Sequence, residues 1–149
     1  MDRGVAVMLT AFTGGLVALQ APINSHLGKS IGTFQTVAFS FAIGAIAMAV
    51  LAALTKGGGL GQLSGVRDVS FIYLTGGLLG AAYVGSVLVT VRHIGLGGVT
   101  AATIAAQLAV AVVVDHFGLL GVEKQPINAA RVAGVLLLAA GTYLVVRDA

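Results

Sequence analysis

Five long apolar stretches, separated by short connections that carry most of the charges, dominate the pattern along this chain. Each stretch is near the roughly 20 residues that a helix needs to cross about 30 Å of hydrocarbon. Because lipid offers the backbone no hydrogen-bond partners, such stretches must be helical. The pattern predicts an all-α polytopic membrane protein, a five-transmembrane-helix bundle with spans near Gly4–Asn24, Thr33–Thr55, Val69–Val91, Gly98–Phe117 and Pro126–Val146.

The connections between these stretches are predicted to be short. The longest, Thr55–Asp68, is rich in glycine, and turns are expected at residues 92–97 and 118–125. Pro126 suits the first turn of the last helix, where a missing N–H has no helical partner to lose. A chain of 149 residues has the length of one domain, so residues 1–149 are predicted to form a single transmembrane domain.

The composition fits a chain whose solvent is lipid. Hydrophobic residues make up 58% and charged residues 9% of the chain, and the mean hydropathy is +1.03. Ordinary globular domains carry about 25% charged residues, so this chain could not cover itself with a polar surface in water. The 22 glycines suit helices that approach each other closely in a membrane.

Little in the sequence points to catalysis, metals or nucleic acid. The chain has no cysteine, which excludes disulfides and thiolate ligands. His26, His93 and His116 lie in three different predicted connections without ligand spacing, so we expect no metal site and no cofactor. The basic residues are scattered singly, which argues against a nucleic-acid surface. No nucleophile motif frames the serines, so the chain is not predicted to be an enzyme.

The charges give only a weak prediction of topology. Positive residues favour the cytoplasmic side, and the eight lysines and arginines divide five to three between the two sides. Either the N-terminus is cytoplasmic by a narrow margin, or the chain inserts in both orientations. The five on the N-terminal side are Arg3, Lys56, Arg67, Lys124 and Arg131, and the three opposite are Lys29, Arg92 and Arg147.

Small residues recur at the spacing that lets helices pack closely. Gly76 and Gly80 form a GxxxG pair, Ser40 and Gly44 a similar pair, and Gly134 and Gly141 lie seven apart. Such pairs serve either packing within one chain or a dimer face. The spacing alone leaves both interpretations open.

Polar residues inside apolar spans are the candidate functional groups, because each must find a partner in lipid. Gln20 and Asn24 share one helix face and flank Pro22, which is expected to kink the first span and free a carbonyl. These two amides either line a polar cavity or lie in the headgroup layer where the span ends.

The third and fourth spans carry further candidates. Thr103 and Gln107 lie on one face of the fourth span, with Gln107 near mid-membrane, as interhelical hydrogen-bonding groups or as site residues. Asp115 follows two turns later and is either an ion or proton site or an interfacial residue that caps the turn. Tyr83, in the middle of the third span, has a hydroxyl that needs a partner and could point into the same cavity.

Several of these motifs together resemble the YdcZ-type family of the drug/metabolite transporter superfamily, which is related to small multidrug resistance and EamA-type carriers. The run that carries the likeness is Gly76–Tyr83, then Gln107, then Asp115–Gly121. Its most specific part is Asp115–Gly118 with the upstream Gln107, and the likeness covers essentially the whole chain. Weaker matches lie in the first and last spans, at Gln20, Asn24, Leu27, Arg131, Gly134 and Gly141.

The resemblance implies a five-helix protomer that functions as a dimer of inverted protomers in the inner membrane. Two antiparallel copies, or two paired chains, would then supply the inverted repeats of a transporter that works by alternating access. A small-molecule substrate would bind at the protomer interface to Gln20, Asn24, Tyr83, Thr103 and Gln107, with Asp115 as the coupling-ion or proton site.

The first span departs from the related small multidrug exporters, which rely on a membrane-embedded glutamate there. Residues 4–24 contain no acid, and Gln20 and Asn24 are the polar side chains flanking the proline. A neutral or zwitterionic metabolite is therefore the favoured substrate. A passive channel along the dimer axis and a membrane scaffold that does not transport are the alternatives.

Overall fold

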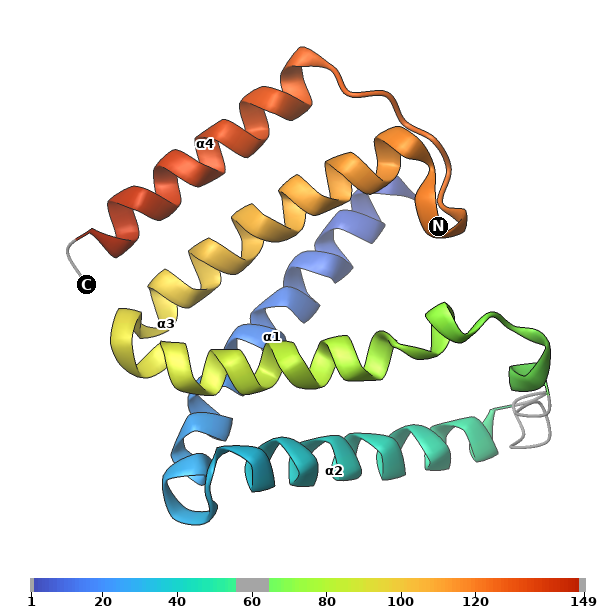
Figure 1. Ribbon diagram of the computed structural model, residues 1–149, viewed down its shortest axis with the longest axis vertical. Coiled ribbons are helices and arrows are strands. Elements are labelled where there is room, and N and C mark those ends of the chain that lie inside the picture. The colour runs from blue at the N-terminus through green and yellow to red at the C-terminus, as the bar shows by residue number, and fades with distance from the viewer. Residues whose placement is uncertain (1, 56–64, 148–149) are drawn as a thin grey trace. The chain divides into compact units, whose positions relative to one another are not determined.

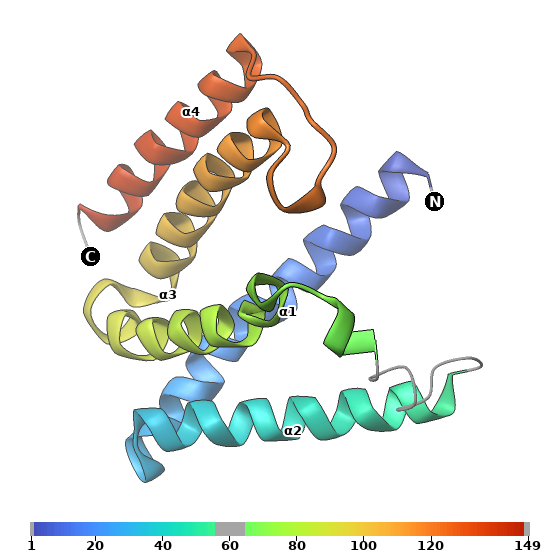
Figure 2. The same cartoon turned by 45° about the vertical axis from the view of Figure 1, so that its right-hand side comes forward.

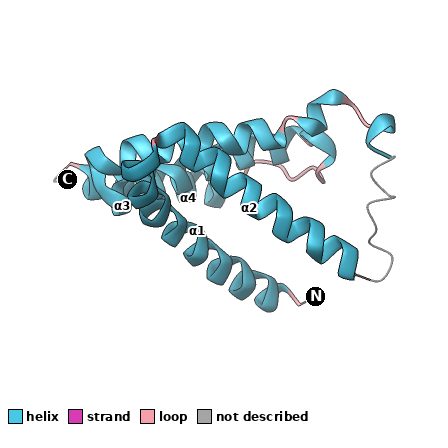
Figure 3. Ribbon diagram, turned by 90° about the horizontal axis from the view of Figure 1, so that it is seen from below, coloured by secondary structure: helices cyan, strands magenta, loops and turns pink. Residues whose placement is uncertain are grey.

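The computed structural model describes residues 2–55 and 65–147, and within these ranges it contains helices and no strand (Figures 1 and 3). Four helices are long and apolar enough to cross a membrane. The chain forms two compact units, residues 1–89 and 90–149. The elements in chain order are α1 (Arg3–Ile31), α2 (Thr33–Leu54), the short 3-10 helix η2 (Phe71–Leu74), α3 (Gly76–Phe117), the 3-10 helix η3 (Leu119–Gly121) and α4 (Ala129–Val146).

Helix α1 is longer than the predicted first span, since it ends at Ile31 rather than near Asn24. The Asp2 side chain caps its start by accepting from the Gly4 N–H at 3.1 Å. Pro22 lies inside the helix without ending it. The helix ends instead at Gly32, whose φ of 92° is accessible to glycine and strained for other residues.

Helix α2 begins directly after Gly32 and packs against α1 (Figure 2). The predicted second span, Thr33–Thr55, agrees with it to one residue. Thr36 is fully buried, and its hydroxyl donates to the Gly32 carbonyl at 2.8 Å. The core of the first unit is a small cluster in which Val37 of α2 meets Val84 and Leu88 of α3.

Helix α3 contains the predicted third and fourth spans in one element of 42 residues. Residues 92–97, predicted as a turn, contain a kink at Gly95, where φ is 67° and ψ 172° and the helical dihedrals are interrupted. The start of the predicted third span is different, because Phe71–Leu74 form a 3-10 turn and the α-helix begins only at Gly76. Four helices of the described residues are long and apolar enough to span a membrane, and α3 is kinked between the predicted third and fourth spans.

Helix α4 starts three residues later than predicted, at Ala129. Pro126 consequently lies before the helix and not in its first turn. Asn128 is the N-terminal cap, with extended backbone and its Oδ1 accepting from the Arg131 N–H at 2.9 Å. The residue before it is bonded to the end of α3, because the Ile127 N–H donates to the Nδ1 atom of His116 at 3.2 Å.

Three further predictions concern the positions of the histidines, the long glycine-rich connection and the number of domains. The histidines lie in helices rather than in connections, His26 in α1 and both His93 and His116 in α3. The glycine-rich connection predicted at 55–68 includes residues 56–64, which lie outside the described residues. That all 149 residues form a single transmembrane domain stays a prediction.

Candidate functional site

One of the buried polar side chains of the first unit is an amide in the last third of an apolar helix. Asn24 is 5% exposed although it lies seven residues before the end of α1. Its Oδ1 accepts a hydrogen bond of 2.9 Å from the Ser40 hydroxyl of α2. The amide therefore helps to join the two helices, as polar groups do in membrane bundles.

The other end of the same amide is unpartnered. The Asn24 Nδ2 atom is buried and has no hydrogen-bond acceptor among the described residues. A buried donor without an acceptor costs about 1–3 kcal/mol. Native proteins keep few such groups, and they commonly mark a functional role or a position filled by water.

A small cavity of about 20 Å³ lies beside this amide, between α1 and α3. Gln20 and Tyr83 line it together with Asn24, so three predicted site residues come together. The side chains of Gln20 and Tyr83 are exposed and form no hydrogen bond among the described residues. The remaining wall is apolar and consists of Val17, Ala21, Val84, Val87 and Leu88.

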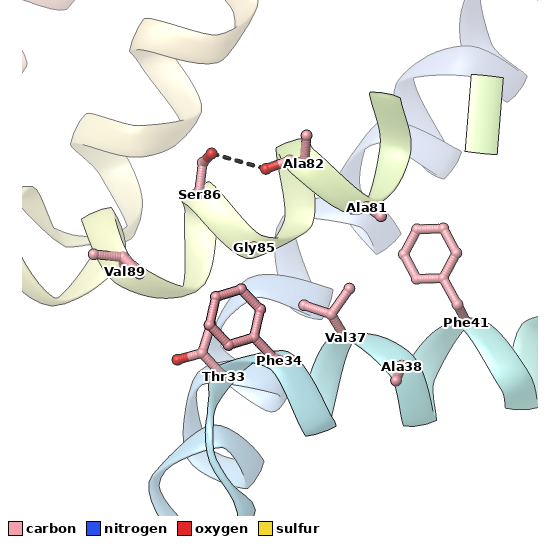
Figure 4. A pocket seen from close by; sticks show the side chains of 10 residues that line it. All are labelled: Thr33, Phe34, Val37, Ala38, Phe41, Ala81, Ala82, Gly85, Ser86 and Val89. Carbon is pink, nitrogen blue, oxygen red and sulfur yellow. Dashed lines mark hydrogen bonds between the residues drawn. The ribbon is translucent and has the colours of Figure 1, made fainter. Parts of the chain in front are cut away.

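A larger and almost entirely apolar groove of about 860 Å³ lies between α2 and the first half of α3 (Figure 4). Phe34 and Phe41 flank Val37 along the α2 side, and small side chains form the α3 side. The Ser86 hydroxyl in its wall donates to the Ala82 carbonyl of its own helix at 2.8 Å. The groove thus offers shape and apolar surface rather than polar recognition.

The other predicted site residues belong to the second unit. Thr103 is half-buried on α3, whereas Gln107 is exposed and its side chain forms no hydrogen bond among the described residues. Thr142 provides one of the hydrogen bonds that join α3 to α4, since its hydroxyl donates to the Ala101 carbonyl at 3.0 Å. Gln107 is therefore not the group that holds these two helices together within one chain.

Asp115, at the end of α3, is bonded through its side chain and through its backbone carbonyl. Its Oδ2 accepts from the Arg131 guanidinium of α4 at 3.2 Å, and its carbonyl accepts from the Gln125 N–H at 2.8 Å. Arg131 also donates to the side chain and to the carbonyl of Gln125. Asp115 and Arg131 are 34% and 25% exposed in their side chains. This cluster of charges ties the 118–128 connection to both helices.

Two residues of these clusters were not predicted as partners. Ser40 is expected from the sequence as a small packing residue, and the structure shows that its hydroxyl orients Asn24. Arg131 is expected as a topology charge, and it pairs with Asp115. The signal for the second pair was present, since two opposite charges interrupt neighbouring apolar stretches across one short connection.

The predicted small-residue pairs have mixed surroundings. A Cβ atom at Gly80 would contact the Phe41 ring at 3.3 Å, and one at Gly134 would contact Leu108 at 3.9 Å. At Gly44, Gly76 and Gly141 a Cβ would meet nothing within 4 Å. Packing within one chain thus explains one member of two pairs, and a dimer face stays a prediction for the others.

Comparison with known proteins gives one match. A family model described as "Putative inner membrane exporter, YdcZ" matches residues 5–144, which is nearly the whole chain. No curated protein sequence matches, and no solved structure does.

Proposed function

Because the chain belongs to the YdcZ-type family of inner membrane exporters, we propose that it exports a small neutral or zwitterionic metabolite by alternating access as a homodimer. Membership of the family confirms the predicted resemblance, the multi-pass membrane character and the inner membrane location. It also makes this a transporter family rather than a class of enzymes. Substrate, mechanism and assembly are our proposals.

We propose that the membrane-embedded protomer has five spans, with α3 supplying two of them. A continuous helix of 42 residues would be about 63 Å long, roughly twice the hydrocarbon thickness. Gly95 interrupts the helical dihedrals near its middle, and Arg92 and His93 come just before it. Two spans of about 20 residues each on either side of Gly95 would fit the bilayer.

The homodimer is supported by the surroundings of Gln107. This amide lies ten residues before the end of α3, between apolar turns, and it is exposed in the single chain. A primary amide that faced lipid would leave its donors and acceptor unsatisfied. A second protomer covering this face would bury Gln107 and could complete the site, as in transporters built from inverted repeats.

The observation that carries the substrate class is the buried amide of Asn24. Its surroundings contain no charged side chain, since the cavity beside it is lined by Gln20, Tyr83 and apolar residues. An uncharged hydrogen-bonding lining favours neutral or zwitterionic molecules over lipophilic cations, which need a carboxylate to neutralise them.

For coupling, Asp115 remains our candidate carboxylate. Its Oδ2 atom is paired with the Arg131 guanidinium, so a coupling ion would either share the carboxylate with Arg131 or displace it. Transport that needs this carboxylate should be lost in Asp115→Asn while the protein stays folded. Retained, gradient-driven transport in Asp115→Asn would remove Asp115 from the mechanism.

The experiment that tests the function compares metabolites released by cells that express the chain with those released by cells that express Asn24→Ala. We expect one class of small metabolite to accumulate outside only with the unchanged chain. Thr13→Val is the matched control on the same helix, because the Thr13 hydroxyl bonds only carbonyls of α1 itself.

The released metabolite is then used in liposomes to separate the alternatives. Saturable flux that is stimulated by substrate on the opposite side supports alternating access. Single-channel current steps would instead identify a passive channel. Equal metabolite release with the unchanged chain, with Asn24→Ala and without the protein would indicate a scaffold.

A further inference from the structure

The two polar atoms of the Asn24 side-chain amide differ in their hydrogen bonding. The Oδ1 atom accepts from the Ser40 hydroxyl, and the Nδ2 atom has no acceptor within residues 2–55 and 65–147, although Asn24 is only 5% exposed. What remains available is therefore an N–H donor. The group that completes this site must bring a hydrogen-bond acceptor.

In the structure Ser40 bonds the oxygen end of the amide and leaves Nδ2 as the available end. Other helical hydroxyls of this chain donate to a carbonyl four residues earlier, for example Thr36 to Gly32 and Ser86 to Ala82. Ser40 instead donates across to α1. Asn24 also lines the cavity between α1 and α3, which is the space beside the amide that a further partner could occupy.

The cavity limits the size of what can reach this donor. Its volume of about 20 Å³ exceeds the roughly 10–15 Å³ that one water needs and leaves no room for a larger group. The exposed side chains of Gln20 and Tyr83 line the same cavity, so the remainder of a larger molecule would lie beside them.

We propose that this cavity is a selective site for one acceptor oxygen, with Asn24 as the donor and Ser40 as the residue that positions it. The oxygen belongs either to a single bound water or to a carbonyl or carboxylate group of a small molecule. In its second form the proposal rests on the proposed function, since the small molecule is then the exported one. An ammonium group could not bond the Asn24 Nδ2 atom, because an ammonium group offers only donors.

Selective labelling can observe this donor directly in the full-length chain in liposomes. Asn24 and Asn128 are the only asparagines, so ¹⁵N-asparagine gives two side-chain signals in solid-state NMR spectra. Asn128 is exposed before α4 and serves as the internal control. Transfer of polarisation from water to the Asn24 side chain would show that water occupies the cavity.

Three small probes distinguish the sources of the oxygen. Acetone and acetate are acceptors only, and ethylammonium is a donor only. A saturable shift of the Asn24 signal with acetone or acetate, absent with ethylammonium, supports recognition of an organic oxygen. Water transfer without any probe-induced shift supports the site and assigns its oxygen to bound water. A shift with ethylammonium alone, or neither water transfer nor any shift, overturns the proposal.

Ser40 variants test the positioning role. In Ser40→Ala the amide is free to turn, so we expect the preference for acetone over ethylammonium to be lost, and Ser40→Thr should restore it. An unchanged preference in Ser40→Ala would remove Ser40 from the site. If the probe preference holds but metabolite release is the same with and without the chain, the oxygen site stands and the proposed export function fails.

Discussion

Asn24 in the first unit and Asp115 in the second are both polar side chains of apolar helices, and they differ in how completely they are bonded. Asp115 has its carboxylate and its carbonyl engaged by residues of the same unit. Asn24 has one end bonded and the other buried without a partner. A polar group that its own chain satisfies contributes to stability, whereas one left half-satisfied is available to bind something else.

The largest effect on stability is expected from the satisfied cluster. Arg131→Leu leaves the Asp115 carboxylate without its guanidinium and removes both bonds to Gln125. The pair is partly exposed, so the loss should be about 2 kcal/mol, between the values typical of exposed and buried pairs. Reversible unfolding in mixed detergent micelles measures it, with Lys124→Gln as a control in the same connection. Equal stability of the two variants would show that the cluster is not structural.

Glycine substitutions compare packing in the two units. A Cβ at Gly98 would lie 3.2 Å from Ile94 and 3.3 Å from Val146, whereas one at Gly85, beside the apolar groove, would meet nothing within 4 Å. Gly98→Ala should therefore lose about 1 kcal/mol through overpacking. Gly85→Ala should gain up to about 1 kcal/mol in helix propensity. The same unfolding measurement decides, and a reversed order would contradict the close approach of α3 and α4.

A smaller effect is expected from the interhelical hydroxyl of the second unit. Thr142→Val keeps the shape of the side chain and removes its hydrogen bond to the Ala101 carbonyl. Interhelical hydrogen bonds in membrane proteins average about 0.6 kcal/mol, so the variant should lose about that much stability. Metabolite release should be unchanged. Loss of release at unchanged stability would place Thr142 in the functional site.

The smallest change in stability is expected at Asn24 and Ser40, where substitutions should affect metabolite release most. Asn24→Leu combined with Ser40→Ala removes both partners of a bond and also the unpartnered Nδ2 atom. Replacing both partners by apolar groups is nearly neutral, so stability should change by less than about 0.5 kcal/mol. Metabolite release should nevertheless be lost. A large loss of stability would mean that the amide is structural, like the Asp115 cluster.

Hydropathy alone predicts that the chain is helical and where its apolar stretches lie, because lipid solvation acts on every residue of a span. It does not predict where helices end, since this depends on single residues. Gly32 at positive φ ends α1 rather than Pro22, and the Asn128 cap delays α4.

The candidate site was predictable in part, because rare polar residues in apolar helices need partners. Gln20, Asn24 and Tyr83 indeed line one cavity. The partners themselves were not predictable, since the bonds of Ser40 and Arg131 depend on which helix faces meet in three dimensions. Ser40, four positions before Gly44, could serve as a small packing residue or as a hydrogen-bond donor. The spacing alone does not distinguish these two roles.

The single-residue connection at Gly32 constrains how this protein is made. Helices α1 and α2 together span Arg3 to Leu54 with one non-helical residue between them. Such a connection has no loop that could be moved across the membrane separately from the helices. During biosynthesis the two helices would therefore enter the bilayer together as a hairpin. Lys29, three residues before the turn, would be the basic residue at its tip, and in the orientation with a cytoplasmic N-terminus it would have to cross the membrane with the hairpin.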